Sequence, residues 1–409
     1  MMMGIHPIIT CLFTSTLRAQ GDHNMEQTHA KKAAYRNPFI AVGINLLATL
    51  MLFIITFSLQ AQDNGLNFSG DFRLRFEMTT KQQPTSSPSV LNPRYREVVR
   101  FRLGMNKQIN DYVKFGSRLA TGSPDDPNTA DVTLGDFVND LTISLDKLYM
   151  EVLYKNLFLT GGKFGNPFLR TDLVWDGDVN PQGASGSTTV PGSKQIMPKF
   201  TGIYYVVDEQ TINPDSYMWG GQARLSVRPN PNWNLTVAGG YYDYTIKSLT
   251  DADAGDTRSN YLTFNADSNL IYLSDFNLVD VIAIIESPGM SERFPLKIVA
   301  DFVKNNGAKV DEDQAFAVDF FLGKASKKND FRFRYGYAKC ETDAVLAAFS
   351  HDNTTIATNY EQHTITIDFV PLEKTTLNLT YYYYRYDKVD PSFDNDYLSR
   401  LRLNAILAF

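Results

Sequence analysis

The chain has 409 residues and a formal net charge of −6, with 22 Tyr, 27 Phe and only two Cys. A mean hydropathy of −0.25 excludes a protein built from many membrane-spanning helices. An aromatic share of 13% is high for a soluble domain and is typical of a β-barrel with aromatic girdles. Length alone would suggest about two or three domains, but large barrels are an exception to that rule.

The N-terminal part has the features of an export signal. Basic residues within 31–36 precede an apolar run from Phe39 to Leu59, which ends in small and polar residues. We therefore predict a leader and signal peptide over residues 1–61 and a mature domain over 62–409. The apolar run is also long enough to be an inner-membrane anchor, which is the alternative. Residues 1–30 have no feature of an export signal. We expect them to come from an upstream start codon or to be removed with the signal.

Removal of this leader changes what the mature chain offers for chemistry. Cys340 is then the one cysteine left, so no intramolecular disulfide is expected. His351 and His363 are the two remaining histidines. The mature chain keeps 35 basic and 43 acidic residues, a net charge of −8, which argues against a nucleic-acid partner.

From residue 66 onward apolar and polar residues alternate with a period of two. In "LNFSGDFRLRFEM", Phe72, Leu74 and Phe76 point one way, and the residues between them point the other way. Short turns alternate with long polar connections, as in outer-membrane barrels. We predict an all-β, transmembrane antiparallel barrel of sixteen strands, with 14 or 18 as alternatives. The strands are expected at 66–77, 95–106, 111–121, 145–154, 157–164, 183–190, 196–207, 217–228, 233–246, 278–286, 295–304, 314–325, 330–340, 361–370, 374–386 and 396–409.

The last strand ends the chain on Phe409, in "RLRLNAILAF". An apolar-alternating terminal strand that closes on Phe resembles the signal by which outer-membrane barrels are recognised by their assembly machinery. Together with the export signal it predicts a location in the outer membrane of a Gram-negative bacterium, in contact with its lipid.

If the apolar residues face lipid, the alternate residues line the lumen. The first, second and last strands are expected to be neighbours in a closed barrel, because closure removes the edges. They would form one basic wall, moderated by Asp71, Glu77 and Glu97, from Arg73, Arg75, Arg96, Arg100, Arg102, Arg400 and Arg402. Other strands turn acids inward, namely Glu151, Asp301, Asp319 and Asp368. A basic wall opposite an acidic one predicts a transverse field across a water-filled pore. A packed salt-bridge network in a closed barrel is the alternative.

Weaker patterns suggest other sites. Carboxylates cluster at 123–131 and 251–256. We interpret them as acidic solvated loops, with Ca²⁺ sites as the alternative, since neither segment has calcium-loop spacing. The Tyr381–Tyr384 run and Tyr241–Tyr242 are interpreted as girdle aromatics, with a sugar-stacking platform as the alternative. His363, on the lipid-facing register, is the basis for an outer-membrane barrel enzyme of the esterase or lipase type, but no serine in a nucleophile motif accompanies it.

Several blocks of sequence resemble the putative porin family of Gram-negative outer membranes. They include "VKFGSRLATGSPDDPNTADVTLGD" (113–136), "LDKLYMEV" (145–152), "GGKFGNPFLRTDLVWDGDVNPQG" (161–183), "AGGYYDY" (238–244), "PLKIVADFVKNNGA" (295–308) and "YGYAKCETDAVLAAFS" (335–350). The resemblance spans residues 66 to 409 and implies a pore; it supplies neither catalytic residues nor a substrate. The sequence departs from the family pattern in its long N-terminal extension and in a shortened region, 184–198.

The segment from 164 to 182 breaks the alternation and carries aromatic residues that a solvated loop has little reason to hold. In sixteen-stranded porins the loop at this position folds into the barrel, and we predict the same here. Phe168 and Trp175 would anchor it to the inner wall. Its three acids, Asp172, Asp176 and Asp178, would face the arginines across the gap.

The function predicted from these features is passive diffusion of small hydrophilic solutes through a porin, with no enzyme activity, metal or cofactor. A channel specific for sugars or organic acids is the alternative. Association into a homotrimer stays open.

Overall fold

The computed structural model describes residues 65–80, 93–126, 128–135, 137–190, 195–212, 214–250, 252, 257, 259–391 and 395–409. The predicted leader and signal peptide lie outside these residues, as does most of the acidic cluster at 251–256. Within the described ranges, no helix has both the length and the apolar character needed to cross a membrane.

Sixteen antiparallel strands follow one another around a single closed sheet. In chain order they are β1 (Leu66–Thr79), β2 (Arg94–Gln108), β3 (Val113–Thr121), β5 (Ile143–Tyr154), β6 (Leu157–Lys163), β7 (Gln182–Thr189), β8 (Ile196–Asp208), β9 (Ser216–Asn230), β10 (Trp233–Thr245), β13 (Phe276–Ser291), β14 (Phe294–Asn305), β15 (Gln314–Gly323), β16 (Phe331–Cys340), β17 (Tyr360–Leu372), β18 (Thr375–Tyr386) and β19 (Leu398–Ala408).

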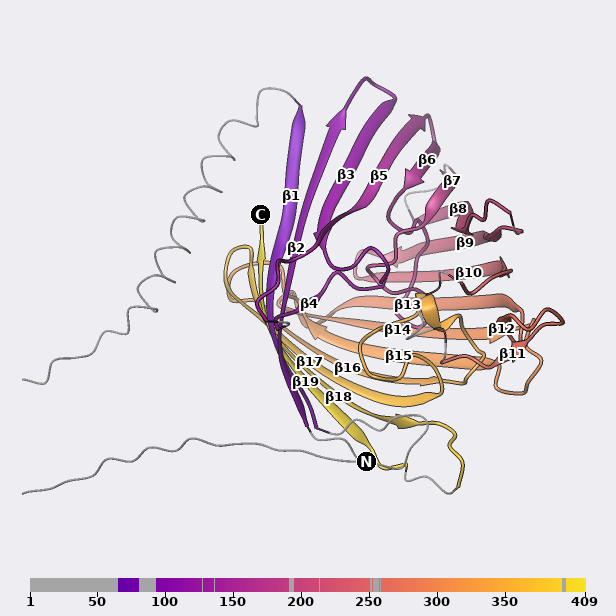
Figure 1. The fold of residues 1–409 in the computed structure, drawn as a ribbon. Helices are drawn as coiled ribbons and strands as arrows, with labels where there is room; N and C mark the ends of the chain where they lie inside the picture. The colour runs from indigo at the N-terminus through magenta and orange to yellow at the C-terminus, as the bar shows by residue number, and fades with distance from the viewer. Residues whose placement is uncertain are drawn as a thin grey trace, which may run out of the picture. The chain divides into compact units, whose positions relative to one another are not determined.

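The sheet closes because β1 pairs on both of its sides. Arg73 lies opposite Arg100 of β2 and opposite Ile406 of β19. At the chain end the backbones of Gly70 and Phe409 exchange two hydrogen bonds of 3.1 Å. Figure 1 shows the yellow C-terminal strand returning beside indigo β1. Closure leaves no unpaired strand edge, which is the condition for a sheet to span a bilayer.

The predicted barrel of sixteen strands is confirmed, with most strand ends within two residues of those expected. The largest difference is β13, which continues to Ser291. The Pro288–Gly289 pair predicts a turn, but the strand passes through an irregularity in register between Ser287 and Ser291.

The two faces of the sheet differ as the period of two requires. Outward residues are apolar and exposed, such as Leu74 (47%) and Phe302 (43%), whereas their neighbours Arg75 and Asp301 are buried. The same parity corrects one prediction. Tyr381 and Tyr383 are exposed on the outer face, but Tyr382 and Tyr384 are buried inside, so the run is not simply a girdle.

The short turns lie at one end of the strands and the long loops at the other. Four long connections matter here: L2 (122–142), L3 (164–181), L5 (246–275) and L7 (341–359). They carry four short elements: β4 (Val132–Thr133) in L2, β11 (Leu262–Phe264) and β12 (Leu270–Tyr272) in L5, and the 3-10 helix η2 (Ala347–Phe349) in L7.

Candidate functional site: loops and charges inside the barrel

L3 leaves the sheet at a pair of glycines. Gly162 of β6 and Gly183 of β7 lie opposite each other, with φ of +115° and +141°. A Cβ on either would lie 2.3 Å from a carbonyl oxygen of the adjacent strand, so only glycine fits. Just beyond them, the Phe164 N–H donates to the Pro181 carbonyl oxygen at 2.9 Å. The two ends of L3 are therefore held close together by backbone geometry.

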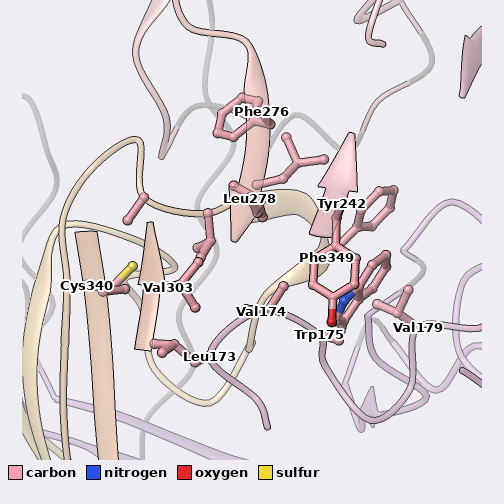
Figure 2. Close-up of a cluster of buried hydrophobic side chains, with 14 of the residues drawn as sticks. Leu173, Val174, Trp175, Val179, Tyr242, Phe276, Leu278, Val303, Cys340 and Phe349 are labelled. Carbon is pink, nitrogen blue, oxygen red and sulfur yellow. The ribbon is translucent and has the colours of Figure 1, made fainter. Parts of the chain in front are cut away.

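Trp175 holds L3 against the inner wall. Its side chain is fully buried, stacks on Phe349 of L7 (centroids 5.8 Å apart, 11° between planes) and meets Tyr242 of β10 edge-on at 5.9 Å. Figure 2 shows Trp175 and Phe349 side by side, next to Tyr242. Phe168 also contacts Tyr242, with centroids 5.2 Å apart. Successive strand residues face opposite sides, so the buried Tyr242 points into the barrel and the exposed Tyr241 points outward. Because Trp175 and Phe168 pack on Tyr242, L3 lies inside the barrel.

Polar contacts reinforce this docking. Gln222 of β9 binds both backbone groups of Leu169, accepting from its N–H at 2.8 Å and donating to its carbonyl oxygen at 2.7 Å. The Thr171 hydroxyl donates to the Asp301 carboxylate of β14. These groups satisfy loop backbone that would otherwise be buried without partners.

Of the three acids in L3, one meets the arginines. Asp178 accepts from Arg102 at 2.8 Å and lies 3.7 Å from Arg100. The expectation for the other two is wrong. Asp172 is 3.5 Å from Arg170 of the same loop. Asp176 is buried where the chain turns: it accepts the Asp178 N–H at 2.7 Å and its own N–H donates to the Phe349 carbonyl oxygen.

Asp176→Asn is expected to stabilise the protein at alkaline pH. Burial, together with the carboxylates of Asp172 and Asp352, holds the pKa of Asp176 well above its ordinary value of 3.8. A raised folded-state pKa contributes stability that is fully present below the unfolded value and is lost as pH rises through the folded value. Asparagine keeps the acceptor for the Asp178 N–H and cannot ionise.

In thermal unfolding, the variant's advantage over the wild type should therefore be larger at about pH 9 than at about pH 5. Asp125→Asn, at an exposed position of L2, is the control and should show no such trend. An advantage of equal size at both pH values would contradict a buried carboxyl that ionises in this range.

The seven predicted arginines do come together on β1, β2 and β19, but each of them is paired with at least one of four carboxylates. Glu77, which is 1% exposed, accepts from Arg96 and from Arg402, each at 2.7 Å, and lies 3.5 Å from Arg400. Three further acids pair with the other four arginines. Asp71 binds Arg100 and Arg102, Asp131 of L2 binds Arg73 and Arg75, and Asp178 of L3 adds its contacts to Arg100 and Arg102.

Glu97 does not belong to this wall. It is exposed and lies with the outward-facing Leu74 and Phe76, because it is one residue out of phase with Arg96. Its expected role in moderating the basic charge is therefore wrong.

The predicted acidic wall is also paired, mostly across neighbouring strands. Asp301, the exception, is buried under L3 and accepts from Thr171. The others sit beside a base: Glu151 is 3.1 Å from Lys114, Asp319 is 2.8 Å from Arg334, and Asp368 is 2.8 Å from Arg332. The bases Lys114, Arg332 and Arg334 did not enter the sequence prediction, since each requires the register of the partner strand.

A second loop, L7, lies inside the barrel and was not predicted to do so. Its Val345 and Ala347 are fully buried, and Phe349 carries the stack on Trp175. Asn260 of L5 ties it down, donating to the carbonyl oxygens of Thr342 (2.7 Å) and Val345 (2.9 Å). The apolar run "AVLAAF" between two polar strand ends was the available signal.

L7 also reaches the arginines. Arg400 donates to the Asn353 carbonyl oxygen and Arg402 to the Asn353 side chain, each at 3.0 Å. The neighbouring His351 is buried, and this burial lowers its pKa to about 4, so the imidazole is neutral at pH 7. L3 and L7 together thus fill much of the lumen near the long-loop end.

The lumen near the short-turn end stays polar and accessible. Arg332, Lys297 and Glu286 point inward, and their side chains are 41–42% exposed. Phe321 lies between Lys297, Arg332 and Arg334, whose charged groups are 5.5 to 5.9 Å from its ring centroid. These exposed luminal charges therefore lie between L3 and L7 on one side and the short turns on the other.

The remaining candidates gain little from the structure. In L2, Asp131 is engaged by two arginines and is not placed for a cation. His363 is on the outer face, where its Nδ1 is 2.9 Å from the Tyr335 hydroxyl; among the described residues, no serine is bonded to it. Across the same residues, no group of three or more His, Cys, Asp or Glu is arranged to hold a metal ion.

Comparison with solved structures identifies the same fold in outer-membrane proteins. OprB of Pseudomonas putida, in its high-pH structure, aligns with a TM-score of 0.58 and 13% identity over 86% of this chain and 96% of that one. OmpT of Vibrio cholerae, an outer membrane protein in trimer form, aligns with a TM-score of 0.50 and 9% identity over 84% and 99%. At these identities the likeness concerns the fold alone.

No curated protein matches the sequence. A family model described as "Putative porin" matches residues 60–272, just over half of the chain. The closed sixteen-stranded barrel, with a polar lumen and an apolar outer face, agrees with that description. The chain therefore belongs to the putative porin family and is a porin-type channel.

Proposed function

We propose that this porin resides in the outer membrane of a Gram-negative bacterium and lets small hydrophilic solutes diffuse passively through its lumen. The observation that carries the proposal is the docking of L3 inside the barrel. Trp175 packs against Tyr242 of the inner wall, and Asp178 accepts a hydrogen bond from Arg102. An inward loop narrows a barrel that is otherwise too wide to be filled by side chains. The short turns would face the periplasm and the long loops the exterior.

The constriction would be set by charge as well as by size. Solutes entering from the long-loop end would pass L3 and L7, then reach the exposed Arg332, Lys297 and Glu286. Basic and acidic side chains are close together at each level. Such a lining favours hydrated polar solutes and disfavours apolar ones. We also propose that Phe409, stacked on Phe101 at 6.2 Å in the closed seam, is read by the assembly machinery during insertion.

Planar-bilayer conductance tests the proposal, and Asp178→Asn is the informative variant. Removing one carboxylate from Arg100 and Arg102 should make the pore more anion-selective, seen as a shifted reversal potential in a salt gradient. Asp125→Asn, in exposed L2, should leave the reversal potential unchanged. A wild-type protein that forms no conducting channel would overturn the pore, and an unshifted potential would place Asp178 off the ion path.

A further inference from the structure

A polar cavity of about 90 Å³ lies where L3 and L7 approach the inner faces of β15 to β18. This space holds several water molecules or part of a small solute. Asp172, about half exposed, marks its open side. The side chains used below are Asp172, Asp319, Arg334, His351, Gln362 and Tyr382.

Two buried polar atoms in this lining have no protein partner. His351 is 4% exposed, and its Nδ1 accepts the Asn353 N–H at 3.2 Å, so the neutral ring carries its proton on Nε2. That Nε2 has no hydrogen bond to any described residue. Gln362, 8% exposed, donates from Nε2 to Thr364 at 3.1 Å and leaves Oε1 without a donor. Buried polar groups are normally paired, so a donor and an acceptor in one cavity point to a ligand that supplies both.

The charges around the cavity favour a neutral ligand. Arg334 is engaged by two hydrogen bonds to Asp319, at 2.8 and 3.0 Å, so its charge is balanced. Asp172 would repel an anion at the entrance. The N–H of His351, with Arg400 and Arg402 behind it, would repel a cation. A hydroxyl group is neutral and both donates and accepts, which matches the two free atoms.

Aromatic surface completes the lining. Tyr360 meets the His351 ring edge-on at 4.8 Å, and Tyr382 reaches Asn353 through its hydroxyl at 3.2 Å. Rings with apolar faces and polar tips suit a solute with C–H faces and hydroxyl edges.

We propose that this cavity is a binding subsite for one hydroxyl-bearing edge of a neutral polyhydroxylated solute, held by His351 Nε2 and Gln362 Oε1, while the rest of the solute extends past Asp172 into the lumen. The proposal rests on the porin function proposed above and names its substrate class. The subsite would make the passage of such solutes saturable at a point beside the constriction.

Glucose titration of the refolded full-length barrel tests the subsite, with binding followed by saturation-transfer NMR and inhibition of ion current followed in planar bilayers. Wild-type protein should show saturable binding and a matching, saturable fall in conductance beyond that caused by a viscosity-matched excluded polymer. Gln362→Leu and His351→Phe should each weaken half-saturation by about tenfold, the effect of one hydrogen bond. If the leucine variant fails to fold, Gln362→Asn replaces it. This variant keeps the amide but shortens the side chain, so it should also weaken half-saturation.

Thr366→Val is the matched control, since it removes a luminal hydroxyl of the same strand away from the cavity. It should leave glucose binding unchanged. Conducting channels that bind no glucose, or binding insensitive to both variants, would overturn the subsite while leaving the porin intact. Binding without conductance would overturn the porin and keep the subsite. Gln362-dependent saturation by succinate or choline instead of glucose would overturn the neutral class.

Discussion

Replacing Trp175 with alanine is expected to release L3 from the inner wall and to raise the conductance of the pore. The side chain is fully buried and packs on Phe349, Tyr242, Tyr205 and Tyr244. Removing a buried Trp costs about 3–5 kcal/mol. The barrel ladder does not involve this side chain, so the loss should fall on the docking of L3 and not on closure of the sheet.

Single-channel recording and limited proteolysis measure this outcome. The variant should show larger and noisier currents, and L3 should become cleavable. Trp219→Ala is the matched control, because Trp219 is 55% exposed on the outer face beside Tyr204. It should change neither the conductance nor the cleavage of L3. Wild-type conductance in the Trp175 variant would mean that L3 does not limit flow.

Replacing Glu77 with glutamine should destabilise the barrel more than any other single loss of a luminal charge. Glu77 lies opposite Arg402 on one side and Arg96 on the other, and Arg400 is close by. Without the carboxylate three arginines, two of them buried, would share one site. Removing one partner of a buried ion pair costs about 3–5 kcal/mol.

Urea unfolding in lipid vesicles measures the stability, and the reversal potential reports the accompanying shift toward anions. Glu286→Gln is the control, because that carboxylate is 42% exposed and 3.7 Å from Lys297. An exposed pair of this kind contributes about 1 kcal/mol or less. Equal losses from the two variants would contradict a special role for the cluster around Glu77.

The strands could be predicted because their signal is local. Each strand repeats its own period of two, so its existence and facing follow from a few neighbouring residues. Where the facing was misread, the error came from treating adjacent residues as a group. Tyr381 to Tyr384 look like one aromatic patch in sequence, but the pleat divides them between lipid and lumen.

The charge pattern of the lumen was harder to predict, since it depends on register between strands. Which base meets Asp319 or Asp368 is decided by the pairing of β15, β16 and β17. The sequence names the charged residues but not their partners. An open field between two walls was therefore expected, and locally paired charges were found.

The loops differ in how clearly their sequences predict an inward course. L3 carries Trp175 and two Phe between glycines, and its inward course could be predicted from these residues. L7 is built mostly from small and hydroxyl residues, and its one signal is the short apolar run "AVLAAF", which contains no Trp and is weaker than the signal of L3. Its placement depends on Asn260 in L5, a contact between segments far apart in the chain.

The stack of Trp175 on Phe349 is expected to form late in folding. One ring comes from the connection after β6 and the other from the connection after β16, so their contact has a large sequence separation. Loop-closure entropy delays such contacts until most of the chain has paired. The constriction would therefore be among the last parts to form, and a closed barrel in which this stack had not yet formed would be a wider and less selective channel than the finished one.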